Sequence, residues 1–139
     1  MNILITGATG YLGGCLLLHL KNNKSFNITT CSTSDNLGLH AKHLKIDWEN
    51  EKSIKQACNS QDIIIHCASP NAKESLLKPE SAYEFSSVIL DRFINQAIIS
   101  NVKKFIYFSS AHIYKSPLSG HLRESTILKP THPYGISKK

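Results

Sequence analysis

The stretch TGATGYLGG, residues 6–14, decides the fold class of this chain. Gly7, Gly10 and Gly13 are spaced as GxxGxxG, after the apolar run Asn2–Thr6 and before leucines at helical spacing. Small residues at these positions let the backbone approach a pyrophosphate, and free amides at a helix N-terminus stabilise its charge. Because a strand precedes the turn and a helix follows it, the stretch predicts a dinucleotide-binding turn; a flexible glycine turn without a ligand is the alternative.

Outward from this turn, short apolar runs alternate with segments of helical period. The predicted strands are Asn2–Thr6, Asn27–Cys31, His43–Asp47, Asp62–Ala68 and Lys103–Ser110. The predicted helices are a segment with Leu12, Leu16, Leu17 and Leu20 on one face, residues 53–60, and the run Pro79–Ser100 with its proline in the first turn. The alternation predicts a doubly wound parallel α/β sheet of about five strands, a Rossmann-like fold. No element is predicted for residues 111–133, and loops of this length are usually functional.

The composition is that of one globular domain, with 139 residues, 41% hydrophobic and 19% charged. The net charge of +6 is spread over single and paired lysines such as Lys103-Lys104 and Lys138-Lys139. We expect these lysines to be solvated and expect no nucleic-acid binding, because an electrostatic footprint needs a cluster. No run approaches the ~20 apolar residues of a membrane span, and the start of the chain lacks the basic region of a signal peptide.

The cysteines and histidines indicate neither a disulfide framework nor a metal centre. Cys15, Cys31, Cys58 and Cys67 show no CxxC spacing, which suits reduced, buried thiols in a cytoplasmic protein. His66 lies within the isoleucine strand and is predicted to be a packed core histidine. His40 and His43 have helical spacing but no cluster of cysteines or carboxylates beside them, so no metal site is expected.

Five segments, in chain order, resemble motifs of the extended short-chain dehydrogenase/reductase family, which contains nucleotide-sugar epimerases, dehydratases and reductases. They are TGATGYLGG, KIDWEN (45–50), DIIIHCAS (62–69), KKFIYFSSAHIYK (103–115) and RESTILKPTHPYGISK (123–138). The resemblance implies the cofactor-binding part of an NAD(P)-dependent epimerase/dehydratase that acts on a nucleotide sugar. It implies cofactor contacts at Gly7, Thr9, Gly10, Tyr11, Leu12, Gly13, Ser32, Asp47, Trp48, Cys67, Ala68, Ser69, Ser87, Tyr134 and Lys138.

The same resemblance places Ser110 at the catalytic serine and Tyr134 and Lys138 at the YxxxK pair. Removing a hydride from a carbinol carbon requires a base for the hydroxyl proton. Tyrosine, with an ordinary pKa of about 10, is a poor base at neutral pH, and a nearby ammonium favours its phenolate. Residues four apart on a helix share a face, so Lys138 is placed to do this for Tyr134. The alternative is an ordinary exposed helix pair, with Ser110 merely ending a strand.

The choice of dinucleotide depends on the residues about 20 positions past the glycines, where an acid usually binds the adenosine ribose. Here Cys31–Ser34 occupies that place and the first acid is Asp35. The missing carboxylate removes repulsion toward a 2′-phosphate, and the hydroxyls of Ser32, Thr33 and Ser34 are potential donors. The sequence therefore mildly favours NADP. NAD stays an alternative, because the length of the loop could allow Asp35 to reach the adenosine ribose. Ser87 is a second departure, since it stands where the family carries an asparagine.

The family's fold continues past the Tyr-Lys helix with further strands and a sugar-binding domain. The resemblance therefore implies that residues 1–139 are an NAD(P)-binding domain that is incomplete at its C-terminal end and inactive alone. Helices below ~12 residues are marginal in water, which predicts a frayed end carrying Tyr134 and Lys138. Exposed edges and the long helix also make self-association plausible. The alternatives are a non-catalytic dinucleotide-binding or redox-sensing module, and a fragment that only associates.

Overall fold

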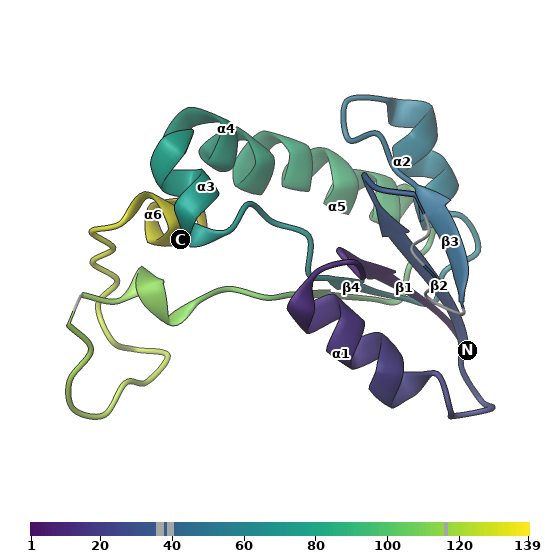
Figure 1. Ribbon diagram of the computed structural model, residues 1–139, viewed down its shortest axis with the longest axis horizontal. Coiled ribbons are helices and arrows are strands. Elements are labelled where there is room, and N and C mark those ends of the chain that lie inside the picture. Colours follow the sequence, from purple (N-terminus) through teal and green to yellow (C-terminus); the bar gives the residue numbers. More distant parts are fainter. Residues whose placement is uncertain (36–37, 39–40, 116) are drawn as a thin grey trace. The chain divides into compact units, whose positions relative to one another are not determined.

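A computed structural model describes residues 1–35, 38, 41–115 and 117–139. The described chain forms two compact units. Unit 1 consists of Met1–Ala68 and Asp91–Phe108, and unit 2 of Ser69–Leu90 and Ser109–Lys139. Figure 1 shows the helices and strands of both units.

Unit 1 contains a parallel sheet of five strands in the order β3-β2-β1-β4-β5. The strands are β1 (Asn2–Thr6), β2 (Asn27–Ser32), β3 (Lys42–Lys45), β4 (Ile63–His66) and β5 (Lys104–Tyr107). Figure 1 shows α1 (Tyr11–Leu20) on one face of the sheet, and α2 (Glu51–Cys58) and α5 (Leu90–Ile99) on the other. The predicted doubly wound, Rossmann-like fold is confirmed.

The central strands are buried because helices cover both faces of the sheet. Ile3 of β1 pairs in register with Ile28 of β2 and Ile63 of β4. On the α1 face, the buried cluster is Ile3, Ile5, Ala8, Leu17 and Ile65. The isoleucine runs thus mark the strands that lie in the middle of the sheet.

The first helix departs from its predicted apolar face at one residue. Leu17 is buried, and Leu16 and Leu20 pack against the same cluster. Leu12 is instead 41% exposed, so this end of the apolar face does not enter the core. It lies in the first turn of the helix, beside the glycine turn, where the chain has only just left the sheet.

The run predicted as one regular helix over Pro79–Ser100 is built from three successive elements. They are α4 (Pro79–Glu84), the π-helical turn η1 (Phe85–Ile89) and α5. Pro79 occupies the first turn of α4, as predicted, where its missing N–H costs no helical hydrogen bond. A π turn inserts one extra residue into a helix, which a pattern of apolar residues does not reveal.

Unit 2 contains a helix that the sequence pattern did not predict, α3 (Ala72–Leu77). The side chain of Asn71 accepts a hydrogen bond from the Glu74 N–H at 2.9 Å, and the Glu74 carboxylate accepts one from the Asn71 N–H at 2.8 Å. This reciprocal capping box, N-x-x-E, was the missed signal. α3 contacts α4 and the last helix, α6 (Pro133–Ser137).

The segment predicted to lack regular structure, residues 111–133, begins with a single 3₁₀ turn, η2 (Ala111–Ile113). The Tyr114 hydroxyl donates to the Arg123 carbonyl at 3.3 Å, and the Arg123 N–H donates to the Thr126 hydroxyl at 2.9 Å. Local hydrogen bonds thus order part of the long loop. Among the described residues, no helix is long and apolar enough to cross a membrane.

The four cysteines are free, and two of them are buried as predicted. Burial raises the pKa of the Cys58 thiol to about 12. Burial, and then the neighbouring Cys58, raise the pKa of the Cys31 thiol even further. Both side chains therefore remain protonated core residues at neutral pH. Cys67 is only partly buried and Cys15 is exposed.

Candidate functional site

Two positions of the glycine turn require glycine, Gly7 because of its backbone conformation and Gly13 because of a close contact. Gly7 has φ +67°, and a Cβ there would lie 2.7 Å from the Ala68 nitrogen. A Cβ at Gly13 would lie 2.5 Å from the Gly7 carbonyl oxygen. The Gly7 N–H donates to the Cys31 carbonyl and the Gly10 N–H to the Gly7 carbonyl, at 2.8 and 2.9 Å. Close packing of turn, strand and helix therefore requires these glycines.

The N-terminus of α1 has backbone amides that are available to bind an anion. Gly10 is the N-cap, and no side chain caps this helix end in the described structure, nor does its first turn contain an acid. The first helical amides, from Tyr11 to Gly13, have no acceptor inside a helix. Their partial positive charge and the small residues around them fit a pyrophosphate. Thr9, Tyr11 and Leu12 are exposed beside these amides.

Thr6 is a site residue that the sequence interpretation missed. Its buried hydroxyl accepts hydrogen bonds from the Cys67 and Ala68 N–H groups at 3.2 and 3.1 Å. With its lone pairs occupied, Thr6 donates its own hydrogen to His66 Nδ1, 3.0 Å away. The hydroxyl thereby fixes the chain after β4 against the glycine turn. The buried β1 pattern gave no signal for this role, because the pairing of β1 with β4 brings the groups together.

His66 is a packed core histidine, as predicted. It is 3% exposed and lies among the rings of Trp48, Phe93, Phe105 and Tyr107, with centroid distances of 5.4 to 6.0 Å. Trp48 itself is 7% exposed and meets His66 and Phe93 edge-on. Its neighbour Asp47 is exposed, and Asp47 Oδ1 accepts the Glu49 N–H at 3.0 Å. The Trp48 side chain is therefore part of the core on the α5 face of the sheet.

The end of β2 is occupied by an internal network. Ser32 is 6% exposed, and its hydroxyl donates to the Ser34 carbonyl at 3.0 Å. Asp35 is exposed and forms an ion pair with Lys45, with an Nζ–Oδ1 distance of 3.1 Å. His43 hydrogen bonds with Thr30 and with Ser34. His40 lies outside the described residues, and those described contain no group of three His, Cys, Asp or Glu side chains arranged for a metal ion.

In unit 2, Tyr134 and Lys138 face each other. The Lys138 Nζ lies 5.9 Å from the centroid of the Tyr134 ring, as the four-residue spacing predicts. Lys138 is only 7% exposed, so the prediction of a solvated lysine is wrong. The predicted frayed end is also wrong, because α6 contacts α3, α4 and η2. Tertiary packing stabilises a helix that is too short to form alone.

Two histidines support this helix. His132 is its N-cap, and its Nδ1 accepts the Tyr134 N–H at 3.1 Å. The His112 ring meets the Tyr134 ring nearly at right angles, with centroids 5.7 Å apart. A Cβ added at Gly135 would overlap the His112 carbonyl oxygen, so α6 and η2 approach closely at the backbone. His132 thus positions Tyr134 through a hydrogen bond to its backbone, and His112 does so through a ring contact. The sequence pattern did not indicate these contacts.

The serines of the proposed site have defined local partners. The Ser110 hydroxyl accepts the His112 N–H at 3.2 Å and caps η2. Ser109 donates to the Lys138 carbonyl at 3.2 Å and ties the end of α6 to the chain after β5. Ser69 donates to the Pro70 carbonyl and Ser87 to the Tyr83 carbonyl, at 2.9 and 2.7 Å. Unit 2 therefore contains all three residues of the predicted Ser/Tyr/Lys set.

The parallel sheet, with a glycine turn between its first strand and first helix, defines a Rossmann-like α/β protein. Residues 3–139 match the model of the NAD dependent epimerase/dehydratase family, and the chain belongs to that family. The predicted family resemblance is confirmed.

Individual relatives agree with this family. The chain is 30% identical to UDP-glucose 4-epimerase of Yersinia enterocolitica, covering 99% of this chain and 46% of that protein. It is 28% identical to dTDP-D-glucose 4,6-dehydratase of Dictyostelium discoideum, covering 98% and 37%. The solved UDP-Glc/GlcNAc 4-epimerase of Campylobacter jejuni superposes with a TM-score of 0.86 at 26% identity, covering 99% and 45%. The chain thus spans less than half the length of these relatives.

Proposed function

We propose that this chain is the NAD(P)-binding domain of a protein that epimerises, dehydrates or reduces a nucleotide sugar by hydride transfer. The named relatives act on UDP- and dTDP-sugars. The observation that carries the proposal is the nearly buried Lys138 ammonium over the ring of Tyr134, in a member of this family. The separate glycine turn, with its uncapped helix N-terminus, supports binding of the dinucleotide pyrophosphate.

In the proposed reaction, the nicotinamide supplies hydride chemistry at a sugar carbinol carbon. Tyr134 takes the proton from the carbinol hydroxyl as the hydride leaves, and returns it in the reverse step. The Lys138 ammonium stabilises the phenolate, and the low exposure of Lys138 strengthens this effect because water screens it less. Ser110 donates a hydrogen bond to the substrate oxygen.

The preferred dinucleotide follows from the end of the second strand. We infer a preference for NADP from the absence of an acid in Cys31–Ser34.

The isolated chain is expected to bind a dinucleotide without turnover. Exposed Tyr83 and Val88 support self-association through α4 and η1. Four free cysteines suit a reducing, cytoplasmic compartment.

Calorimetric titration of the chain with NAD and NADP tests the binding half of the proposal. Saturable binding of either dinucleotide to folded protein is the expected result. A folded sample that binds neither would contradict the proposed function.

A chimera tests the catalytic half. Residues 1–139 would replace the matching part of the Yersinia enterocolitica epimerase, and the Tyr134→Phe form is expected to lose turnover by about 10²–10⁴-fold, as for a lost acid–base group. Dinucleotide affinity should stay close to that of the unsubstituted chimera. Full turnover by the Tyr134→Phe chimera would rule out the proposed base.

A further inference from the structure

The carboxyl ends of β2 and β3 present four polar side chains on one face of the sheet. In the parallel register, Thr30 pairs with His43 and Ser32 pairs with Lys45. Side chains two residues apart on a strand point to the same face. Lys45 therefore stands directly beside Ser32, at the strand end where a Rossmann-like sheet meets the adenosine ribose.

The hydroxyl and imidazole donors next to Lys45 are already used within the protein. The Ser32 hydroxyl donates to the Ser34 carbonyl at 3.0 Å. His43 Nε2 donates to the same carbonyl at 3.0 Å, and His43 Nδ1 lies 2.8 Å from the Thr30 hydroxyl. These bonds fix the Ser34 carbonyl and leave the side chains of Ser32 and His43 with little capacity to recognise an anion.

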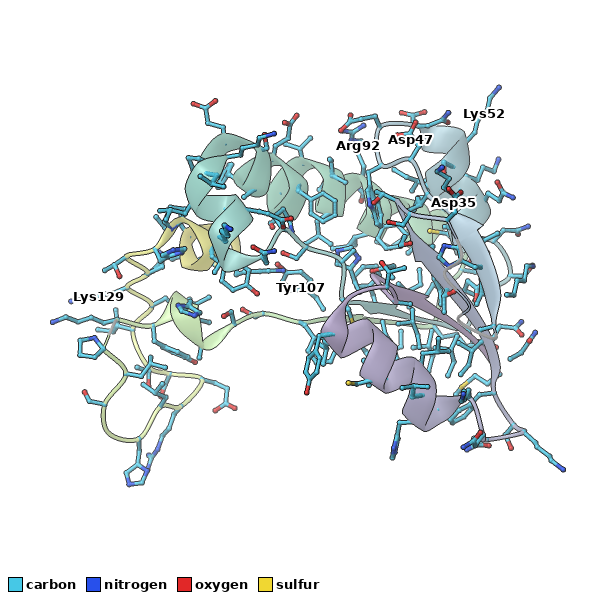
Figure 2. All side chains as sticks on the ribbon, in the orientation of Figure 1. Asp35, Asp47, Lys52, Arg92, Tyr107 and Lys129 are labelled. Atoms are coloured by element: carbon cyan, nitrogen blue, oxygen red, sulfur yellow. The ribbon has the colours of Figure 1, made fainter. Side chains whose placement is uncertain are left out.

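Lys45 is the side chain of this group that can still bind an anionic ligand. Its Nζ lies 3.1 Å from Asp35 Oδ1, and the two side chains are 62% and 80% exposed (Asp35 is labelled in Figure 2). An exposed pair of this kind contributes little stability, because water screens both charges. A ligand with a stronger anionic group can therefore displace the Asp35 carboxylate at small cost.

We propose that Lys45 selects a dinucleotide that carries a 2′-phosphate, and that Asp35 is the counter-ion with which this phosphate competes. The assignment rests on the proposed function and identifies the residue behind its NADP preference. A phosphate group carries more negative charge than a carboxylate and forms strong charge-assisted hydrogen bonds with an ammonium. A 2′-hydroxyl has no such charge, so Lys45 discriminates between the two dinucleotides.

Two lysine variants of the whole chain test the assignment, with calorimetric titration against NADP and NAD. Lys45→Met is expected to weaken NADP binding about fivefold, the upper end of the range for an exposed charge pair, and to leave NAD binding unchanged. Lys42→Met is the matched control, since it removes the same charge from the same strand at an exposed position. Its affinities for both dinucleotides should equal those of the unsubstituted chain.

A third variant tests the competition itself. Asp35→Asn removes the counter-ion and is expected to tighten NADP binding several-fold, with a smaller effect on NAD. The inference is overturned if Lys45→Met changes both affinities alike, or changes neither while the unsubstituted chain binds. If the folded, unsubstituted chain binds neither dinucleotide, the proposed function is contradicted, and so is the inference that rests on it.

Discussion

At the scale of single residues, Asp62 joins separate segments of unit 1. Its Oδ2 accepts the Asn2 N–H at 2.8 Å, and its Oδ1 accepts a hydrogen bond from Lys103 Nζ at 2.7 Å. The bond to Lys103, and then the bond to Asn2, lower the pKa of this carboxyl. The ionised form is therefore the one that the folded state stabilises.

We expect Asp62→Asn to lower the free energy of unfolding at pH 7. The same change should also make this free energy decrease less as the pH falls. A carboxyl whose pKa is lowered by folding stabilises the protein above its unfolded pKa of about 4. That contribution is lost as the pH falls through the folded pKa. Urea unfolding between pH 7 and pH 2 measures it, with the exposed Glu84→Gln variant as control. Parallel pH curves for Asp62→Asn and the unsubstituted chain would contradict the role of Asp62.

Gly13→Ala is expected to destabilise the protein by about 1–3 kcal/mol, the usual cost of overpacking. The added Cβ would lie 2.5 Å from the Gly7 carbonyl oxygen, so the helix or the turn must move. Gly14→Ala is the matched control, because its Cβ would lie 3.3 Å from the Ala8 carbonyl oxygen, a tight contact that a much smaller shift relieves, and alanine's higher helix propensity offsets part of the cost. Thermal unfolding compares the two variants, and equal effects would show that the close approach at Gly13 is unimportant.

At the scale of elements, α6 depends on its cap and its neighbours. His132→Ala removes the acceptor of the Tyr134 N–H and should destabilise the helix by about 1 kcal/mol. His132→Asn is expected to recover most of this loss, because asparagine is a strong N-cap. Exchange of the α6 amides that follow Pro133, residues 134–137, measures both variants. If the asparagine variant exchanges as fast as the alanine one, the His132 ring acts through packing and not through its cap.

The aromatic cluster joins α5 to the sheet in unit 1. Phe93 is fully buried and meets Trp48, His66 and Phe105 at centroid distances of 5.3 to 5.4 Å. Phe93→Ala should therefore cost about 3–5 kcal/mol, as for other buried aromatic residues. Phe108→Ala is the control, since Phe108 is 37% exposed. Chemical unfolding measures the free energy of unfolding of both variants. Similar decreases in the two variants would contradict the role of Phe93 at the centre of the aromatic cluster.

At the scale of the whole molecule, the two units differ in how they are held together. The large, fully buried side chains, among them Phe93, Leu4, Ile5, Leu17, Ile54 and Ile64, lie in unit 1. Unit 2 is built from helical elements of six residues or fewer, and its fully buried residue of this set is Ser75. Apolar burial is the main stabilising term in folding, so unit 1 should resist opening more strongly.

We expect native-state amide exchange to follow this difference. Amides of β1 and β4 should exchange only through global unfolding, whereas amides of α3 and α6 exchange through smaller openings. Exchange measured at low denaturant separates the two classes. Bound dinucleotide should slow exchange at the start of α1, since a ligand stabilises the state that binds it. Equal protection in both units would contradict the assignment.

Much of the fold could be predicted because its signals lie in contiguous residues. The strands of the sheet follow from apolar runs, and the glycine turn follows from its own spacing. The missed helix α3 had a local signal as well, the Asn71-Glu74 capping box. The π turn at Phe85–Ile89 had none, because one extra residue in a helix leaves the apolar pattern nearly unchanged.

The sequence by itself determined a parallel α/β sheet, a glycine turn between the first strand and the first helix, and a Tyr-Lys pair on one helical face. These features depend on backbone sterics and side-chain periodicity within a few residues. Only the tertiary structure decided that Thr6 braces Ala68, that Lys45 stands beside Ser32, and that Lys138 is buried. Each of these depends on strand register or helix packing between segments far apart in the chain, and no local pattern encodes such a distance.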